Sequence, residues 1–382
     1  MNVEPCLHKR IVLSLLLLGC CMTFNVSVLE AQDPAFSQYF NNRTYSNPAF
    51  TGIDGALTFT AAYRKQWSKV PGGFTTQSVS VEDFEPCFNS GLGLFVMQDT
   101  EGEGILRTQM AALSYAYVIP FRQGKTLHNV RLGFSPYWMQ KDIDWNRLIF
   151  SDQLDPKQGA IYPTQFQPFE DIPVNFGGLN AGFVYRRDKP TRWKDDSQLS
   201  IGVAVNHLLN ISFNTGPIES LQGLDTGLSP RISAFLGFYH PIFRMTNKRY
   251  LFYVTPQFKY ESQGKIQSSS LGATIRYESM TVGLFYQNTT PFADWQNTNA
   301  FVAYVGVSMG VANNQAIDIG LSYDTNPGGL RSRTGGVFEV SIKYFIDNNG
   351  LFCKLFDMGS GDNRVHCPPV GQPAKRRFRQ TK

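Results

Sequence analysis

The chain has 382 residues, 42% of them hydrophobic and 14% aromatic, and its formal net charge is +5. This charge is too small to indicate a nucleic-acid partner, and the mean hydropathy of −0.22 excludes a protein built from membrane-spanning helices. The length allows either two soluble domains or one large barrel. With 30 Phe and 17 Tyr, the aromatic content is high for a soluble protein and typical of the aromatic girdles of outer-membrane barrels.

The first 31 residues have the layout of a secretory signal peptide. A basic pair, Lys9 and Arg10, precedes the apolar run 11–18, and small and polar residues follow as far as Ala31. Cleavage next to Ala31 would leave Asp33 close to the mature N-terminus. We therefore predict that the protein is exported and that residues 1–31 are removed.

Six cysteines raise questions of processing and pairing. The residues ending at Cys20 also fit a lipoprotein site, so lipidation of Cys20 is an alternative to plain signal cleavage. In the mature chain Cys87, Cys353 and Cys367 remain, in a compartment that permits disulfides. Cys353 and Cys367 flank a short polar loop and are the predicted pair, with three free thiols as the alternative. His366 is nearby, but no fourth ligand at a usable spacing indicates zinc.

Short alternating strands occupy almost all of the chain from 55 to 346. In the last strand, apolar Phe338 and Ile342 face one way, and polar Glu339 and Lys343 face the other. A soluble sandwich would show the same alternation, but the strand number, the export signal and the aromatic content favour an all-β fold, a transmembrane outer-membrane β-barrel of about 14 antiparallel strands. We expect strands near 55–65, 73–84, 91–99, 105–121, 127–143, 179–186, 198–207, 229–242, 249–261, 265–277, 279–288, 297–310, 315–324 and 335–346.

The connections are unequal in the way that such barrels require. An even strand number brings both termini to the same side, which we expect to be the periplasm, so the two longest connections, about 144–178 and 208–228, face outward. Short inner turns and long outer loops are the expected asymmetry, although the inner connection 187–197 is longer than a turn. The tight inner connections are 122–125, 245–248, Glu278 and 312–314.

Two segments flank the barrel. Residues 33–54 are rich in Asn, Pro and aromatic side chains, and they could plug the lumen, line the periplasmic mouth or lie across the rim. Residues 347–382 carry few apolar side chains and form a periplasmic tail that needs a disulfide to hold much structure. The basic end 375–382 is expected to be a solvated terminus, with docking to an acidic partner as the alternative.

The sequence offers no catalytic, metal or cofactor site. It contains neither a Gly-x-Ser-x-Gly elbow nor a His-Glu-x-x-His zinc motif, and no phosphate loop or nucleic-acid patch. The acidic stretch 99–103 lacks the twelve-residue spacing of a calcium loop. His207, at a strand end, is the one candidate base, and a His with ordinary hydrogen bonds at a loop entry is the simpler interpretation. We therefore do not expect an enzyme.

A series of motifs lies in order along the chain: Asp33-Pro34-Ala35-Phe36-Ser37-Gln38-Tyr39-Phe40, Tyr45-Ser46-Asn47-Pro48-Ala49-Phe50-Thr51-Gly52, Tyr63-Arg64-Lys65-Gln66-Trp67, Gly91-Leu92-Gly93-Leu94 with Asp99 and Gly102, Leu148-Ile149-Phe150-Ser151-Asp152-Gln153-Leu154-Asp155, Asn206-His207-Leu208, Ser322-Tyr323-Asp324 and Glu339. Together they resemble the PorP/SprF family of type IX secretion system membrane proteins of Bacteroidetes, over about residues 33–346. Two departures stand out. The chain continues to Lys382, and Ser68 follows Trp67 where the family often has Pro.

The resemblance implies a non-enzymatic outer-membrane protein without cofactors that supports type IX export. Some family members contact periplasmic ring components, and others are dedicated partners through which a large adhesin with a C-terminal sorting domain is secreted and held at the surface, notably in gliding motility. We expect outer loops 144–178 and 208–228 to grip such a cargo, while periplasmic turns and the tail contact the type IX translocon or ring components. The alternative, a passive porin or hydrophobic-solute channel, fits the strand pattern alone equally well.

Individual residues carry both a functional and a structural interpretation. The polar residues of 33–38 are the best candidates for a periplasm-side functional element. Trp67 at the outer rim is either a partner contact or a girdle residue. Asp152, in the long outer loop, either contacts the cargo or stabilises a turn. Glu339 and Lys343 share the inward face of the last strand, where the alternatives are a pair with each other or pairs across strands. The candidate residues are Asp33, Phe36, Ser37, Gln38, Asn47, Pro48, Arg64, Gln66, Trp67, Asp152, Gln153, His207, Asp324 and Glu339.

Overall fold

The computed structural model describes ten stretches of the chain, which all belong to one compact unit, Ala31–Lys382. The signal segment and the tail predicted at 347–382 lie outside the described residues, apart from Asp347. The described stretches are 33–102, 106–144, 147–165, 173–191, 196–212, 229–244, 251–288, 299–312, 314–325 and 334–347.

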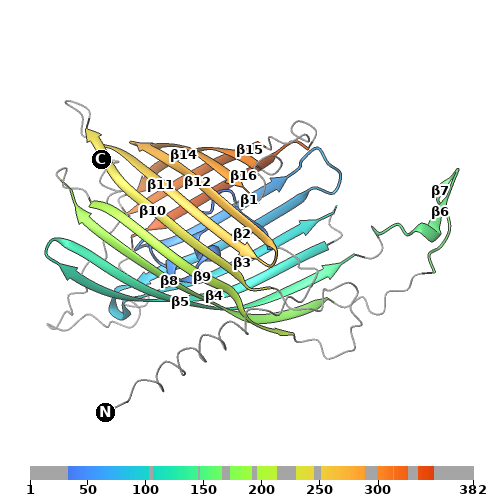
Figure 1. The fold of residues 1–382 in the computed structure, drawn as a ribbon, viewed down its shortest axis with the longest axis horizontal. Helices are drawn as coiled ribbons and strands as arrows, with labels where there is room; N and C mark the ends of the chain where they lie inside the picture. Colours follow the sequence, from blue (N-terminus) through green and yellow to red (C-terminus); the bar gives the residue numbers. More distant parts are fainter. Residues whose placement is uncertain are drawn as a thin grey trace, which may run out of the picture. The chain divides into compact units, whose positions relative to one another are not determined.

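Fourteen strands of the described residues form one closed antiparallel barrel, which confirms the predicted fold (Figure 1). The barrel closes where the first strand pairs with the last, from Leu57 opposite Ile346 to Gln66 opposite Val337. Closure leaves no unpaired sheet edge. The strands are β1 Leu57–Gln66, β2 Phe74–Glu85, β3 Ser90–Glu101, β4 Leu106–Gln123, β5 Thr126–Ile143, β8 Val174–Pro190, β9 Asp196–Ser212, β10 Arg231–Arg244, β11 Leu251–Gln263, β12 Ile266–Tyr277, β13 Met280–Asn288, β14 Asn299–Ala312, β15 Gln315–Thr325 and β16 Val337–Ile346.

Alternation separates the two faces of the wall as predicted. In β16 the outward side chains of Phe338 and Ile342 are 45% and 42% exposed, whereas Glu339 and Ser341 face the lumen and are 0% and 2% exposed. A barrel wall in a bilayer needs this apolar outer band, because lipid cannot solvate polar groups. No helix among the described residues is long and apolar enough to cross a membrane.

Two strands are longer than the sequence indicated. β8 begins at Val174, inside the predicted loop 144–178. β9 ends at Ser212, inside the predicted loop 208–228. The pairing register shifts between Leu179 and Ala181. This bulge interrupts the period of two, which is why the alternation is hidden in the sequence.

The two ends of the barrel differ in their connections. At one end, here the turn end, strands are joined by short turns such as Gly124-Lys125 and Glu278-Ser279. At the other, here the loop end, the connections include 67–73 and 144–173. Within the second of these, β6 Leu154–Asp155 and β7 Gly159–Ala160 form a separate small hairpin (Figure 1).

Residues 33–56, here called the plug, lie inside the barrel. They contain the short helix α2, Arg43–Ser46, and the 3-10 turn η1, Pro48–Phe50. Both pack against the wall rather than against solvent, with Ala49 0% and Phe50 3% exposed. Figure 1 shows this blue segment enclosed by the strands. Of the three placements left open by the sequence, this arrangement corresponds to a segment that fills the lumen.

Candidate functional site

The first described residue of the plug is held by a cluster of polar side chains, here the Asp33 cluster. The carboxylate Oδ2 of Asp33 lies 2.7 Å from His207 Nε2 and 3.3 Å from Arg231 Nη1. Its backbone N–H donates to Gln263 Oε1 at 3.1 Å. On the other side of the imidazole ring, His207 Nδ1 lies 2.8 Å from the hydroxyl of Tyr137. A buried carboxylate needs such partners, because burial without them is costly.

His207 reaches the lumen through an irregularity of β9. Asn206 and His207 are consecutive, yet they are only 1% and 2% exposed, so both point inward. A regular strand would turn one of them to the lipid. His207 has a φ of +59°, and its backbone N–H donates to Asn180 Oδ1 at 2.9 Å, beside the bulge of β8. Strained backbone of this kind persists only where surrounding contacts fix it.

A second cluster, here the Glu339 cluster, holds the next residues of the plug. The backbone N–H groups of Ser37 and Gln38 donate to the two carboxylate oxygens of Glu339, at 2.7 and 3.2 Å. The Ser37 hydroxyl donates to Asp324, and Arg64 Nε lies 3.8 Å from Glu339. Glu339 therefore contacts the plug backbone and Arg64, its partner across from β16 on β1, which corresponds to the cross-strand pairing considered from the sequence.

Asn47 ties the middle of the plug to the wall. Its side-chain oxygen accepts from Ala49 N–H at 2.9 Å and so caps η1, which begins with Pro48. Its amide nitrogen donates to the backbone oxygens of Phe183 and Val203, at 3.2 Å each. Those carbonyls belong to β8 and β9, so one side chain fixes both the plug turn and its place on the wall.

Glycines let the plug backbone approach this wall closely. A Cβ atom at Gly133 would overlap the backbone of Ala49, and one at Gly182 would overlap the side-chain oxygen of Asn47. Arg131 lies beside them at 1% exposure and donates Nε to the backbone oxygen of Ala49 at 2.8 Å. Its Nη2 also donates to the backbone oxygen of Thr51. Glycine and arginine thus form a seat for the turn.

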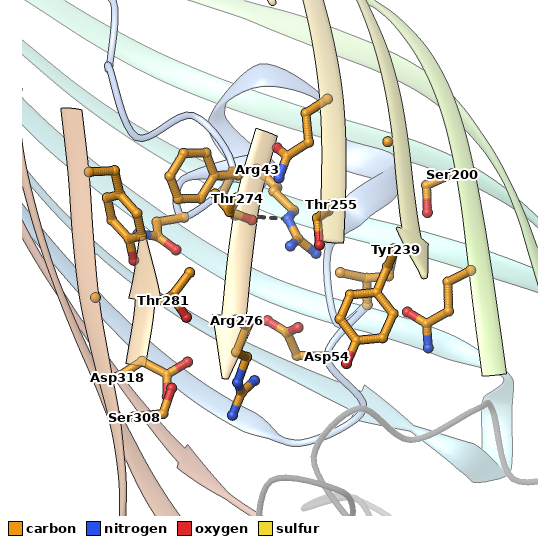
Figure 2. A pocket seen from close by; sticks show the side chains of 18 of the residues that line it. Arg43, Asp54, Ser200, Tyr239, Thr255, Thr274, Arg276, Thr281, Ser308 and Asp318 are labelled. Atoms are coloured by element: carbon orange, nitrogen blue, oxygen red, sulfur yellow. Dashed lines mark hydrogen bonds between the residues drawn. The ribbon is translucent and has the colours of Figure 1, made fainter. Parts of the chain in front are cut away.

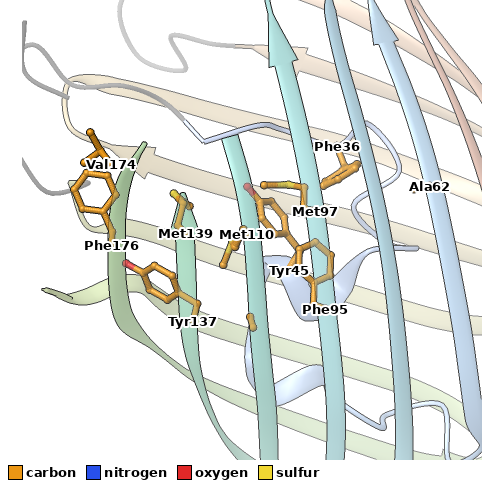
Figure 3. Packing of buried hydrophobic residues seen from close by; sticks show 11 residues of the cluster. Phe36, Tyr45, Ala62, Phe95, Met97, Met110, Tyr137, Met139, Val174 and Phe176 are labelled. Atoms are coloured by element: carbon orange, nitrogen blue, oxygen red, sulfur yellow. The ribbon is translucent and has the colours of Figure 1, made fainter. Parts of the chain in front are cut away.

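Aromatic side chains fill the space between the polar contacts. The rings of Phe36 and Tyr45 meet edge to face at 5.3 Å, and Tyr45 stacks on Phe95 of β3 at 5.3 Å. Met97 and Met110 belong to the same buried cluster, which continues to Phe176 of β8 (Figure 3). Each such buried side chain contributes on the order of 2 kcal/mol by leaving water. A second buried cluster, which is mostly aromatic, contains Tyr39, Phe40, Phe285, Val302 and Tyr304.

A cavity of about 210 Å³ lies between the plug and the turn-end halves of strands β8–β15. Arg43 and Asp54 enter it from the plug, and Arg276 and Asp318 from β12 and β15 (Figure 2). Its other lining side chains include hydroxyls, among them Ser200, Thr255, Thr274, Thr281 and Ser308. No group of His, Cys, Asp and Glu in the described stretches could hold a metal ion.

The loop end carries a second candidate region, here the outer arm, residues 147–165. Asp152 accepts from Gln165 N–H at 2.7 Å and from the Thr164 hydroxyl at 2.9 Å. The Gln165 N–H is the main reason why the pKa of Asp152 is lowered, and the Thr164 hydroxyl adds to it. Gln153 Oε1 accepts from Phe150 N–H at 2.8 Å. Four apolar side chains of the arm are 66%, 52%, 48% and 51% exposed, namely Ile149, Leu154, Ile161 and Tyr162.

Most sequence-predicted residues meet in the lumen. Beyond the clusters already described, Phe36 and Pro48 pack within the plug, and Gln66 accepts from Arg64 Nη1 at 2.8 Å. Trp67 instead lies in the loop-end connection 67–73, where it has a φ of +58° and meets Phe74 edge to face. Asp152 and Gln153 lie apart from the lumen, in the outer arm.

Several residues of the site were not predicted. Arg131, Arg231 and Tyr137 occupy lumen-facing positions in β5 and β10, and their buried charge or hydroxyl contacts the plug or the Asp33 cluster. The inward phase of the alternation could have selected them. Gly133 and Gly182 carry no such signal, since many glycines occur in the strands.

The cysteine prediction falls largely outside the described residues. Cys353 and Cys367 both lie there, so their pairing stays a prediction. Cys87, in the 3-10 turn η2 Pro86–Phe88 at the turn end, is disulfide-bonded, and its partner lies outside the described residues. The disulfide of Cys87 differs from the alternative of three free thiols.

Solved structures similar to this chain are outer-membrane barrels. The CymD monoaromatic hydrocarbon channel is 12% identical over 80% of this chain and 92% of that chain, with a TM-score of 0.41. CdiB from Acinetobacter baumannii is 10% identical over 75% of this chain, with a TM-score of 0.39, and the match spans 59% of CdiB. The outer membrane protein Omp33 of Acinetobacter baumannii is 5% identical over 77% of this chain and 99% of that chain, with a TM-score of 0.36. No curated protein matches the sequence.

The family comparison covers most of the chain. A family described as "Type IX secretion system membrane protein PorP/SprF" matches residues 28–344, which include the plug and nearly the whole barrel. The motifs that suggested this family are those that join the plug to the wall and build the outer arm. The chain belongs to the PorP/SprF family of type IX secretion system membrane proteins.

Proposed function

We propose that this barrel is a non-enzymatic outer-membrane component of the type IX secretion system that binds and retains an exported surface protein. The observation that carries the proposal is the filled lumen, with the plug bonded to the wall from Asp33 to Asp54. A barrel built to conduct solutes has no need of a polar network that locks a segment inside it. In a barrel that serves as a rigid docking platform, such a network has a role, because it holds the wall and the plug together as one body.

The plug contacts favour a permanent element over a gate. Asp33 and Glu339 are buried carboxylates whose partners come from both the plug and the wall. Withdrawing the plug would leave charged groups in the lumen without those partners, and breaking one buried pair costs about 3–5 kcal/mol. Several pairs would break together. The lumen is therefore a poor route for solutes or for protein.

The outer arm supports contact with an exported protein. Its internal hydrogen bonds, such as Gln165 N–H to Asp152, hold a defined shape while Ile149, Leu154 and Ile161 stay exposed. Loops at one end of a rigid scaffold are common binding elements. We assign the arm, together with the loop predicted at 208–228 between β9 and β10, to binding the C-terminal sorting domain of an adhesin-type cargo. Gliding motility is one process that such a cargo could serve.

The turn end would then face the periplasm, as in other barrels with short inner turns. The C-terminal end of β16 lies there, since Ile346 pairs with Leu57 at the start of β1. The inner turns and the tail that follows β16 are the parts available to the translocon or to periplasmic ring components.

His207 does not favour an enzyme. Its two ring nitrogens are engaged by Asp33 and Tyr137, at 2.7 and 2.8 Å. A general base needs a free nitrogen directed at a substrate. The contacts instead suit a residue that anchors the plug.

Affinity capture of the tagged barrel from crosslinked native outer membranes tests the proposed function. We expect a large exported protein with a C-terminal sorting domain, or type IX components, among the captured proteins. An Ile149→Asp, Ile161→Asp variant should lose the cargo, and Lys125→Glu in an inner turn is the matched control that should keep it. Recovery of the same bulk outer-membrane proteins from all three would refute the proposal.

The alternative is a solute channel, and the cavity beside β8–β15 is the observation in its favour. It holds about 210 Å³ and is lined by Arg and Asp side chains as well as by aromatic ones. Planar-bilayer recordings separate the two functions. Steady single-channel current from the intact protein would support the channel, and its absence would support the platform.

A further inference from the structure

The contacts of the plug follow one direction along the barrel. Its first residue, Asp33, pairs with Arg231, the first residue of β10, and with Gln263, the last residue of β11. Both residues lie at the loop end of their strands. Ser37 and Gln38 come next and contact Asp324 and Glu339, close to the loop ends of β15 and β16.

The rest of the plug continues toward the turn end. Asn47 bonds to Phe183 and Val203, in the middle of β8 and β9. Asp54 lies 3.9 Å from Lys343, three residues before the end of β16. β1 then begins at Leu57, at the turn end itself. The plug therefore spans the lumen once, from the loop end to the turn end.

The strands β11 and β12 are joined by a short turn next to the start of the plug. β11 and β12 are joined at the loop end by only Gly264 and Lys265, directly after Gln263, which binds Asp33. Ala35 is exposed, whereas the next five residues of the plug are buried. The start of the plug thus meets solvent at the mouth of the loop end.

We propose that the mature N-terminus of this protein lies at the cell surface, and that the plug crosses the outer membrane inside the lumen as an additional, non-strand crossing. The inference deepens the proposed function and rests on it for the outward orientation of the loop end, and it takes the mature chain to begin near Asp33, as the predicted signal cleavage implies. It replaces, for the N-terminus, the periplasmic placement that strand parity suggested. The C-terminal end of β16 stays on the opposite side.

The placement has a consequence for binding. Residues 33–35 and the amino group freed by signal cleavage become part of the outer surface, at the foot of the loops. An exported protein held there would contact the plug as well as the outer arm. Periplasmic components, in contrast, could reach only the inner turns and the tail.

Cysteine labelling in intact cells tests this topology. Ala35→Cys places a thiol at the start of the plug, Lys265→Cys marks the loop end and Lys125→Cys marks the turn end; all three native positions are exposed. With a membrane-impermeant maleimide we expect labelling at 35 and 265 in intact cells, and at 125 only after the membrane is opened. The unchanged protein gives the background from native cysteines.

The outcomes separate the inference from the proposed function. The inference is overturned if position 35 is labelled under the same conditions as position 125 and not as position 265. It is also overturned if position 35 is not labelled in intact cells. Labelling of 125 but not 265 in intact cells reverses the orientation and so refutes the proposed function. An epitope inserted before Asp33 gives a second measurement, and we expect an antibody to bind it on intact cells.

Discussion

The plug and the outer arm use similar residues in opposite surroundings. In the plug, Ser37 and Gln38 are 2% and 0% exposed and share Glu339, which belongs to a strand some 300 positions away, with separations of 302 and 301. In the arm, Asp152 bonds to Gln165, 13 positions away, and the apolar Ile149 remains 66% exposed. The first arrangement stabilises a closed barrel. The second keeps a defined surface exposed, which is the surface that we propose for the exported partner.

Removal of the plug should have the largest effect of any change. Deleting residues 33–54 takes away the side chains that fill the lumen, so we expect steady ionic current in planar bilayers where the intact barrel gives none. Deletion of residues 148–164 in the arm is the control and should leave the bilayer silent. Equal currents from the two deletions would show that the plug does not seal the barrel.

Loss of the Glu339 carboxylate should have the second-largest effect. In Glu339→Ala, the N–H groups of Ser37 and Gln38 and the Arg64 guanidinium lose their acceptor in a buried site. We expect about 3–5 kcal/mol less stability in urea unfolding from detergent or lipid, as for other broken buried pairs. Glu339→Gln keeps one acceptor oxygen and should lose less. Equal losses for both variants would contradict a role for the carboxylate.

Filling the glycine seat should have an intermediate effect. Gly133→Val pushes a side chain into the backbone of Ala49, so the plug turn must shift. We expect a loss of about 1–3 kcal/mol, as for other overpacked cores. Ala303→Val on the lipid-facing side of β14 adds two methyl groups without touching the plug, and its unfolding midpoint should stay unchanged. A matching loss in both would remove the argument for a seat.

The plug and the wall also show how much of the fold and of the site could be predicted from the sequence. Alternation predicted the wall because a strand between lipid and lumen must alternate, as Phe338 and Glu339 do. The family motifs selected Asp33, His207 and Glu339, but their spacing could not show that they meet. Asp33 meets His207 across 174 positions and Ser37 meets Glu339 across 302, through a closed barrel that no local pattern encodes.

Where local rules failed, tertiary contacts had overridden them. A regular β9 would point His207 at the lipid, and only the bulge near Leu179 with the left-handed backbone turns it inward. The direction of the plug was likewise hidden. Strand parity places the start of β1 at the turn end, but it says nothing about a segment that folds back through the lumen. Such a segment is fixed by its partners, Arg231 and Gln263 among them.

The smallest expected effect is a pH dependence confined to the arm. The Gln165 N–H, followed by the Thr164 hydroxyl, lowers the pKa of Asp152, so the folded arm favours the carboxylate. Its contribution is therefore complete above the ordinary Asp pKa of about 3.9 and is lost as the pH falls through the lower folded value. A dye on Gln158→Cys should lose anisotropy over that acidic range. Asp152→Asn removes the charge, so the dye should already have the lower anisotropy at pH 7 and show a smaller acidic change, with the remainder due to Asp155, whose pKa is lowered chiefly by the Lys157 and Gln158 N–H groups. An anisotropy in the unsubstituted arm that stays constant through strong acid would mean that the carboxylate does not shape it, and the exposed apolar side chains would then need another support.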